Sequence, residues 1–288
     1  MNFLGRSIMD DSIELTVIIL NYKNPELTLK CVDLLMSALD KATIISEIII
    51  VDNSSAESES FFEKHLSFGA DNIVLIKNKK NLGFAKANNQ GMKIARGKYI
   101  LLLNNDVFIK DSNVISKGLN YLKSHSNVGI WSPALVNKDG IIQKTTGKIP
   151  SLLGLINEYY FFNIFEKYKR FFKISKVDTI IGAFWLIPSS IIKKVGLLDE
   201  DYFFTSEDTD YCNRIHKEGL SIIYDSSVNV VHLGGASQNW KWLNDPYLHI
   251  GRELYFKKNK NGVTFILARY IIRSGLYYRR LISHIRHN

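Results

Sequence analysis

Residues 15–20 read Leu-Thr-Val-Ile-Ile-Leu, and residues 47–51 read Glu-Ile-Ile-Ile-Val. Such continuous, β-branched apolar runs are typical of strands that are buried on both faces of a sheet. Between them, Pro25 begins a stretch with apolar residues at helical spacing that extends to Leu39, as a helix requires. A strand, a helix and a second strand in this order predict an α/β fold with a mainly parallel central sheet and flanking helices.

The same pattern continues along the chain, and each predicted strand leads into polar residues. Residues 73–76 and 99–103 predict two more strands, with a helix over residues 84–95 after a turn at Gly83. In open α/β sheets, ligands bind beyond the carboxyl ends of the strands. We therefore expect one crevice to be lined by the polar residues that follow the four strands, namely Asn21, Asp52, Asn81 and Asp106.

The second half of the chain is less regular. Its patterns predict helices over residues 112–122, 189–195 and 207–218, and strands over residues 128–131, 180–187, 222–224 and 228–232. The aromatic stretch over residues 152–172 is typical of a core or an interface. Since the sequence shows no internal repeat and no low-complexity linker, we expect one domain over residues 1–258, followed by a basic, amphipathic helical tail over residues 259–288.

The composition is that of a folded protein. The chain has 288 residues, of which 46% are hydrophobic and 23% charged, which provides enough apolar material for a sizeable core. Its two cysteines are too few for a disulfide scaffold or a thiolate cluster, so a reducing compartment is expected. Residues 1–14 lack the apolar run of a secretory signal, and no run reaches the roughly 18 apolar residues of a spanning helix. These features favour a cytoplasmic protein.

The net charge of +9 lies mainly in the tail. After Glu253 the sequence contains eight Lys and Arg residues and no acid, so about +1 remains for everything before. A nearly neutral body with a basic, aromatic tail fits an anionic membrane surface at least as well as a polynucleotide. We expect no nucleic-acid partner.

Helical geometry gives the tail a basic side. Five of its residues fall within about 60° of one another on a helix, namely Arg269, Arg273, Arg280, His284 and His287. Most of its apolar residues point elsewhere, which is the pattern of a helix lying among lipid headgroups. This predicts a peripheral protein at the inner face of the plasma membrane. The alternative is a solvated charged face on a helix that packs against the domain.

Asn104-Asn105-Asp106 follows the strand predicted over residues 99–103, where a carboxylate can leave the buried sheet for a cleft. Oxygen ligands of this kind suit a hard divalent cation such as Mg²⁺ or Mn²⁺. Beside a diphosphate, such a cation neutralises the charge that develops as the bond to the diphosphate breaks. Asp106 is therefore a candidate metal ligand. The alternative is that Asn-Asp simply forms a turn.

A second acidic cluster begins the helix predicted over residues 207–218. Glu207 and Asp208 follow Phe203 and Phe204 closely. Acids in the first turn of a helix suit the helix macrodipole, which explains some of them but not the aromatic residues before. A carboxylate beside apolar walls is a stronger base, because desolvation raises its pKa. Asp208 is the candidate general base for a hydroxyl, with Glu207 in reserve.

His232 ends a β-branched run and precedes Leu233-Gly234-Gly235. A lone histidine is more often structural, but the two glycines would let a bulky ligand approach the backbone. His232 is therefore a further candidate ligand. The sequence contains no Gly-rich phosphate loop ending in Lys-Ser or Lys-Thr, no dinucleotide glycine fingerprint and no zinc-type spacing of Cys and His. These absences exclude kinases and dehydrogenases.

Taken in order, these motifs resemble the family-2 glycosyltransferases of the GT-A fold, particularly the bacterial rhamnosyltransferase-like branch. The resemblance covers roughly residues 15–240. The segments that carry it are Val17-Ile18-Ile19-Leu20-Asn21-Tyr22, Ile49-Ile50-Val51-Asp52-Asn53-Ser54-Ser55, Asn81-Leu82-Gly83-Phe84-Ala85 with Asn88 and Asn89, Leu102-Leu103-Asn104-Asn105-Asp106, Gly182-Ala183-Phe184, Glu207-Asp208-Thr209-Asp210 and Val231-His232.

The resemblance implies a nucleotide-sugar half over about residues 15–110 and an acceptor half over about residues 111–258. It implies Asp106 and His232 as metal ligands, and Asp208 as the base of an inverting, single-displacement transfer. Asn104 departs from the family's Asp-x-Asp motif, and a neutral amide there implies weaker metal binding. The donor-binding residues that it implies are Asn21, Asp52, Asn53, Gly83, Asn88, Asn89, Asn104 and Asn105.

The branch resemblance suggests dTDP-rhamnose as the donor, with UDP-sugars next, and a glycan or polyprenyl-linked acceptor hydroxyl in cell-surface polysaccharide synthesis. A sugar nucleotidyltransferase is an alternative, but it should have a basic, Gly-rich triphosphate loop near the first strand, which residues 20–25 do not form. A non-catalytic carbohydrate or nucleic-acid binding module is another. That alternative leaves Asp106, Asp208 and His232 without a role.

Overall fold

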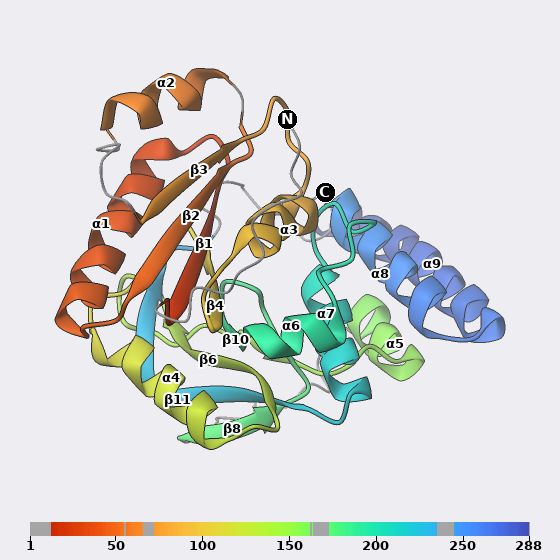
Figure 1. Cartoon of the computed structure of the whole chain (residues 1–288). Helices are drawn as coiled ribbons and strands as arrows, with labels where there is room; N and C mark the ends of the chain where they lie inside the picture. Colours follow the sequence, from red (N-terminus) through yellow and green to blue (C-terminus); the bar gives the residue numbers. More distant parts are fainter. Residues whose placement is uncertain are drawn as a thin grey trace.

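The computed structural model describes residues 13–54, 56–65, 72–161, 163, 173–234 and 245–287. Its N-terminal half confirms the four strands that the sequence predicts. They are β1 (Leu15–Asn21), β2 (Ser46–Asp52), β3 (Ile73–Lys77) and β4 (Tyr99–Asn104), and they are mutually parallel in the order β3-β2-β1-β4 (Figure 1). Their carboxyl ends therefore meet along one edge of the sheet.

The second half of the sheet is mixed in direction. β10 (Phe184–Pro188) runs antiparallel between β4 and β6 (Val128–Val136), and β11 (Ser221–His232) runs parallel to β6. β11 also pairs antiparallel with β5 (Val107–Phe108) and β8 (Ile174–Val177). A small separate sheet joins β7 (Thr146–Gly147) and β9 (Thr179–Ile180). The α/β class with a mainly parallel central sheet is confirmed.

Two strand predictions need correction. The single strand expected over residues 180–187 is split into β9 and β10, because the backbone turns at Gly182-Ala183. The two strands expected over residues 222–224 and 228–232 are one strand, β11, whose pairing with β6 shifts register between Asp225 and Asn229. The polar run Asp225-Ser226-Ser227, which lies between the two predicted strands, is accommodated as an irregularity within β11.

Helices cover both faces of the sheet. α1 (Pro25–Lys41) and α4 (Asn113–Ser124) pack on one face, and α3 (Phe84–Ile94), α6 (Ser189–Val195) and α7 (Glu207–Lys217) pack on the other (Figure 1). α2 (Ala56–His65) contacts α1. Along β1, Val17 and Ile19 point to the first face and Ile18 to the second. This alternation explains why a doubly buried strand is apolar throughout.

A third group of helices forms its own apolar cluster. It consists of α5 (Leu152–Tyr160), α8 (Pro246–Asn259) and α9 (Gly262–His287). α9 buries Ala268 and Ile272 completely, and a Cβ added at Gly275 would lie 2.5 Å from Tyr159 Cβ. The predicted C-terminal helix is confirmed, and Tyr159 has the predicted core role. Residues 162 and 164–172 of the aromatic stretch lie outside the described residues, as do residues 1–12.

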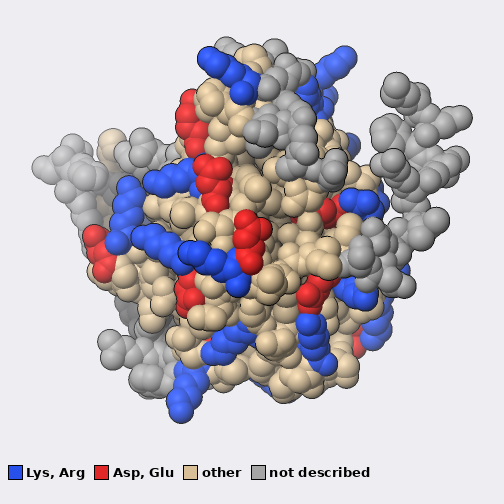
Figure 2. All heavy atoms as spheres, turned by 60° about the vertical axis from the view of Figure 1, so that its left-hand side comes forward, with Lys and Arg blue, Asp and Glu red and all other residues tan. Residues whose placement is uncertain are grey.

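The surface charge of the body is mixed. On the face shown in Figure 2, basic and acidic side chains of the described residues are interspersed across a largely uncharged surface. Lys194 with Glu218 and Lys123 with Glu14 are examples of paired opposite charges. No helix in the described part of the chain combines the length and the apolar character needed to cross a bilayer.

Candidate active site

The ends of β1 and β2 carry a buried hydrogen-bond network. Asn21 and Asp52 are paired in register across the two strands, and Asn21 Nδ2 donates to Asp52 Oδ1 at 2.8 Å. The same amide also donates to Ser54 Oγ at 3.1 Å. Both predicted donor-contacting residues are almost completely buried, at 0% and 2% exposure. The structure thus brings them together, as expected from parallel strands.

Thr28, on the first turn of α1, extends this network toward the predicted metal motif. Its Oγ1 donates to Asn21 Oδ1 at 2.9 Å and accepts from Asn105 Nδ2 at 3.0 Å. A chain of side-chain hydrogen bonds therefore runs from Asp52 through Asn21 and Thr28 to Asn105. Thr28 was not predicted as a site residue, and a threonine one turn into a helix carries no distinctive sequence signal.

Asn53 holds the turn that precedes α3. Its Oδ1 accepts from Leu82 N at 2.9 Å, and its Nδ2 donates to Asn81 Oδ1 at 2.7 Å. Gly83 has φ of +85°, and a Cβ added there would lie 2.5 Å from Phe203 O. Only glycine fits this position, because the backbone is left-handed and touches another backbone segment. The turn is thereby joined to the segment that precedes Glu207 and Asp208.

Asn88 and Asn89 lie within α3, where their amides bond to protein groups. Asn88 Nδ2 donates to Phe84 O at 2.9 Å. The Asn89 side chain makes two hydrogen bonds to the backbone of Leu198. It donates to Leu198 O at 2.8 Å and accepts from Leu198 N at 3.0 Å. Both side chains are buried. The Asn89 contacts tie α3 to the segment that follows α6. The predicted contacts of Asn88 and Asn89 with a donor stay a prediction.

Asp106 and His232 are adjacent, although 126 positions separate them. β5 begins one residue after Asp106 and pairs with the end of β11, so that His232 lies opposite Val107. His232 Nε2 lies 3.5 Å from Asp106 Oδ1, and Leu233 N donates to Asp106 O at 3.0 Å. On its other side, His232 Nδ1 lies 2.7 Å from Gln143 Oε1. The two predicted metal ligands thus share one buried location.

The chemistry of this pair suits Mg²⁺ or Mn²⁺. A carboxylate oxygen and an imidazole nitrogen face each other at the strand ends, both from residues less than 10% exposed. In the described ranges, no group of three or more His, Cys, Asp and Glu side chains is arranged to hold a metal. Mg²⁺ and chemically similar ions are commonly bound through one or two carboxylates together with substrate phosphates. The residues present therefore fit an ion that is completed by its substrate.

Glu207 and Asp208 begin α7 after two residues with left-handed backbone. Thr205 and Ser206 have φ of 67° and 70°, a conformation that costs non-glycine residues free energy and is common at functional sites. Burial raises the pKa of Asp208, against the opposing effect of hydrogen bonds to Oδ1 from Thr209 N and Oγ1. Burial and the neighbouring charge of Asp208 raise the pKa of Glu207 well above its usual value. The local structure thus makes both carboxylates more basic than in water.

The Gly182-Ala183 turn lies between the strand that leads to Asp106 and the acidic pair Glu207-Asp208. Asn104 N donates to Ala183 O at 3.0 Å, and a Cβ added at Gly182 would lie 3.9 Å from Asp208 Cβ and 3.7 Å from the Phe84 ring. Asn104, two residues before Asp106, and Asp208 therefore flank the same short turn. The Asn81–Phe84 segment borders it as well.

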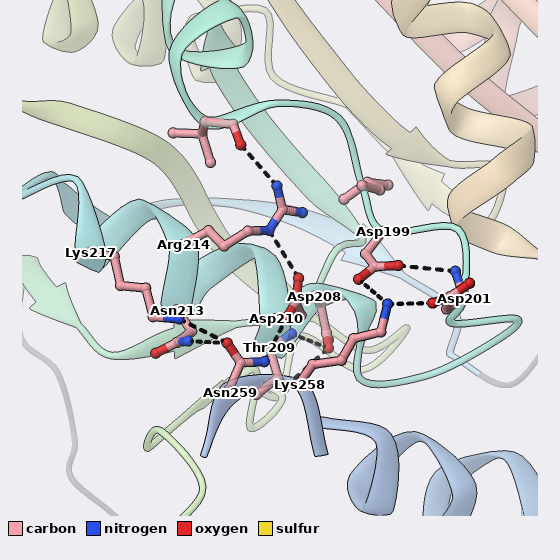
Figure 3. Close-up of polar contacts among 12 residues, drawn as sticks. Asp199, Asp201, Asp208, Thr209, Asp210, Asn213, Arg214, Lys217, Lys258 and Asn259 are labelled. Carbon is pink, nitrogen blue, oxygen red and sulfur yellow. Dashed lines mark hydrogen bonds and ion pairs between the residues drawn. The ribbon is translucent and has the colours of Figure 1, made fainter. Parts of the chain in front are cut away.

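α8 supports α7 from outside the site. Figure 3 shows Asn259 bridging Asp210 and Asn213 of α7, and Lys258 contacting Asp199 and Asp201. Arg252 of α8 pairs with Glu158 and lowers the pKa of Asp208 through its charge, although burial has the larger, opposite effect. Sequence reasoning missed Arg252, because α8 was not predicted and nothing local links it to residue 208.

Comparison with known proteins identifies the family. Residues 16–196 match the family profile described as "Glycosyl transferase family 2". The chain belongs to this family. The glycosyltransferase is 24% identical over 242 residues to the low-salt glycan biosynthesis hexosyltransferase Agl10 of Haloferax volcanii, covering 79% of this chain and 68% of that protein. It is 27% identical over 183 residues to poly-beta-1,6-N-acetyl-D-glucosamine synthase of Staphylococcus aureus, but spans only 40% of that protein's length and 62% of its own.

Solved structures confirm the GT-A-like fold of this glycosyltransferase. GalNAc-T7 with UDP, GalNAc and Mn²⁺ superimposes with a TM-score of 0.63 at 14% identity, over 85% of this chain and 49% of that chain. The mannosyltransferase PcManGT of Pyrobaculum calidifontis, in complex with GDP-Man and Mn²⁺, gives 0.56 at 15% identity, over 93% and 75% of the two chains. At these identities the likeness concerns the fold alone.

Proposed function

We propose that this glycosyltransferase moves a hexose from a nucleoside diphosphate donor to a hydroxyl of a glycan or lipid-linked acceptor, with inversion at the sugar carbon and with Mg²⁺ or Mn²⁺. The observation that carries the proposal is the arrangement around Gly182-Ala183. On its β4 side the turn contacts Asn104, two residues before Asp106, and on its other side Asp208 lies beside Gly182. This short turn thus lies between the proposed metal-binding segment and the proposed base, which supports the proposal.

In the proposed reaction, Asp208 takes the proton of the acceptor hydroxyl. The hydroxyl oxygen forms a bond to the anomeric carbon while the bond from that carbon to the diphosphate oxygen breaks. Because Thr209 donates twice to Oδ1 of Asp208, the proton is assigned to Oδ2. The divalent ion, when bound, supplies positive charge that stabilises the departing diphosphate. Burial makes Asp208 a stronger base, and the reaction needs its deprotonated form.

Substitution of the two carboxylates tests this proposal. Asp208→Asn should lower turnover by about 10²–10⁴-fold and leave nucleotide binding intact, because the base acts only on the acceptor. Asp106→Ala should abolish turnover and leave the fold intact, because the departing diphosphate then lacks the stabilising charge of the divalent ion. Radiolabelled UDP-hexoses and dTDP-rhamnose would be assayed with Mn²⁺ or Mg²⁺, with the exposed Asp33→Asn as control. Near-normal turnover of Asp208→Asn would show that Asp208 is not the general base.

The nucleotide of the donor is a separate part of the proposal. The branch resemblance favours dTDP-rhamnose, whereas the two solved neighbours contain UDP and GDP-Man. A thermal-shift screen of dTDP, UDP and GDP, each with and without Mn²⁺, distinguishes them. A ligand at 100 times its Kd stabilises the folded protein by about 2.7 kcal/mol, so the preferred nucleotide should give the largest Mn²⁺-dependent shift.

We also propose that α9 rests on an anionic membrane surface on the side where lipid-linked acceptors lie. Opposite the buried Ala268 and Ile272, α9 exposes an apolar, aromatic stripe. Arg269 and Arg273, which flank the stripe, contact Glu253, so the apolar stripe and not the arginines carries most of the proposed contact. The stripe consists of Val263, Ile266, Tyr270, Tyr277 and Leu281, which are 46–71% exposed.

Vesicle flotation tests the membrane contact. Removal of the whole tail is unsuitable, because Ala268 and Ile272 belong to the core. Replacing two stripe residues, Ile266→Ser with Tyr270→Ser, should lower binding to vesicles containing anionic lipid about tenfold or more. Ile45→Ser is the matched control, since Ile45 is 61% exposed on another part of the molecule. Equal flotation of both variants would show that the stripe does not touch lipid.

A further inference from the structure

Gln143 contacts His232 twice, although no motif includes it. Its Nε2 donates to His232 O at 2.8 Å, and its Oε1 lies 2.7 Å from His232 Nδ1. The glutamine is itself fixed by its backbone, because Gln143 N donates to Leu135 O at 2.8 Å and the neighbouring Ile142 bridges to Val136. The side chain therefore extends from the margin of β6 to clamp the last residue of β11.

These two contacts determine which nitrogen of His232 carries the proton. A backbone carbonyl can only accept, so the group of Gln143 that faces His232 O must be the NH₂. The oxygen of the same amide then faces Nδ1, and since that oxygen can only accept, Nδ1 must be the donor. In the neutral imidazole, the lone pair is left on Nε2. That is the nitrogen 3.5 Å from Asp106 Oδ1.

We infer that Gln143 is a positioning residue that holds His232 in the Nδ1–H form and directs its Nε2 lone pair toward the oxygen of Asp106. The inference rests on the proposed metal dependence. Ligating histidines usually donate their second ring N–H to a fixed acceptor, which sets the tautomer and the ring orientation. Gln143 is such an acceptor, and its second bond, to His232 O, also fixes the backbone of the ligand.

The separation of Asp106 and His232 agrees with this role. A distance of 3.5 Å between Nε2 and Oδ1 exceeds the 2.7–3.2 Å of an ordinary N–H···O bond. In the Nδ1–H form, Nε2 has a lone pair and no proton, so it does not donate a hydrogen bond to Asp106 Oδ1. The nitrogen and the carboxylate oxygen are then two electron-pair ligands that a cation can bind. Residue 143 thus contributes to the metal site without touching the ion.

Nitrogen-15 NMR of the histidine rings tests the tautomer directly, without metal or substrate. For the neutral imidazole, the spectrum distinguishes protonated Nδ1 from protonated Nε2. His232→Gln identifies the signal. The wild-type protein should show Nδ1–H at His232, and Gln143→Leu should show the loss of this single form. A wild-type His232 protonated at Nε2 would overturn the inference.

If Gln143 positions a metal ligand, its loss should weaken metal binding. This is tested by measuring Mn²⁺ affinity from the EPR signal of the free ion in the presence of UDP. Gln143→Leu should weaken Mn²⁺ binding by about 10–100-fold. Gln143→Glu should recover part of it, because a carboxylate still accepts from Nδ1. Gln90→Leu is the matched control, since Gln90 also makes two amide hydrogen bonds, with Asn78, and should keep wild-type Mn²⁺ affinity.

The outcomes distinguish a failure of the proposed metal dependence from a failure of the proposed role of Gln143. If the wild-type protein binds no Mn²⁺ with dTDP, UDP or GDP, the proposed metal dependence fails whatever the tautomer. If it binds Mn²⁺ and Gln143→Leu binds equally well, the metal site stands and the positioning role of Gln143 is refuted.

Discussion

Gly251 tests how closely α8 controls the candidate base. It lies inside α8, and a Cβ added there would be 2.7 Å from Thr205 O and 2.9 Å from Ser206 Oγ. Thr205 and Ser206 are the two left-handed residues that lead into Glu207 and Asp208. Gly251→Ala therefore presses a methyl group against the backbone segment that leads directly into the acidic pair.

The expected magnitude combines two opposing effects. Replacing glycine by alanine inside a helix stabilises it by about 0.8–1.0 kcal/mol. Forcing an additional methyl group into a packed site costs about 1–3 kcal/mol. The net change is a loss of stability between about zero and 2 kcal/mol, or up to several degrees in Tm, given about 2–4 °C per kcal/mol for domains of 150–250 residues. Activity should change more, because misplacement by about 1 Å can cost 10²-fold in rate.

The assay measures unfolding, Mn²⁺ binding and turnover on the same preparations. Gly251→Ala should lower kcat about tenfold or more and leave Mn²⁺ affinity unchanged, because the Asp106–His232 pair depends on β5 and β11. Gly262→Ala is the control, since an added Cβ there meets nothing within 4 Å. A Gly251→Ala variant that is more stable than wild type and fully active would refute the reasoning that this contact positions α7.

Two further predictions concern buried ionisable groups. Because the folded state raises the pKa of Glu207, folding favours its protonated form, and this contribution to stability is lost as the pH rises through the raised pKa. Glu207→Gln should therefore have a larger free energy of unfolding in urea than wild type at neutral pH. The difference between the two free energies should shrink toward about pH 4; a difference that does not change with pH would contradict this. Burial raises the pKa of the Cys31 and Cys212 thiols, so Ellman's reagent should label neither in the native protein and both in denaturant. Rapid native labelling would show that one is accessible.

The sequence predicts the elements that are long and uniform in pattern. β1 and β2 are apolar throughout, and α1 begins at a proline after an asparagine cap whose side chain accepts from Leu27 N. β5 has only two residues, too few to show any period, and its existence depends on its pairing with β11. Asp106 could thus be named from the sequence, whereas its contact with His232 could not be derived from spacing.

The supporting residues of the site were less predictable than its ionisable ones. Carboxylates after apolar runs are conspicuous, so Asp106 and Asp208 stand out. Gln143 lies between Ile142 and Lys144 in an irregular segment, and its role arises only when β6 and β11 are neighbours. Arg252 acts on Asp208 from a helix that begins 38 positions later. Such residues depend on tertiary proximity, which the periodicity of a single sequence does not contain.

The pairing of β5 with the end of β11 also determines when Asp106 and His232 come together as the protein folds. Closing this contact brings residue 106 to residue 232, and contacts so distant along a chain are slow to form. Asn21 and Asp52 meet through neighbouring strands much earlier in the chain. A newly made molecule therefore brings Asp106 and His232 together later in folding than it brings Asn21 and Asp52 together.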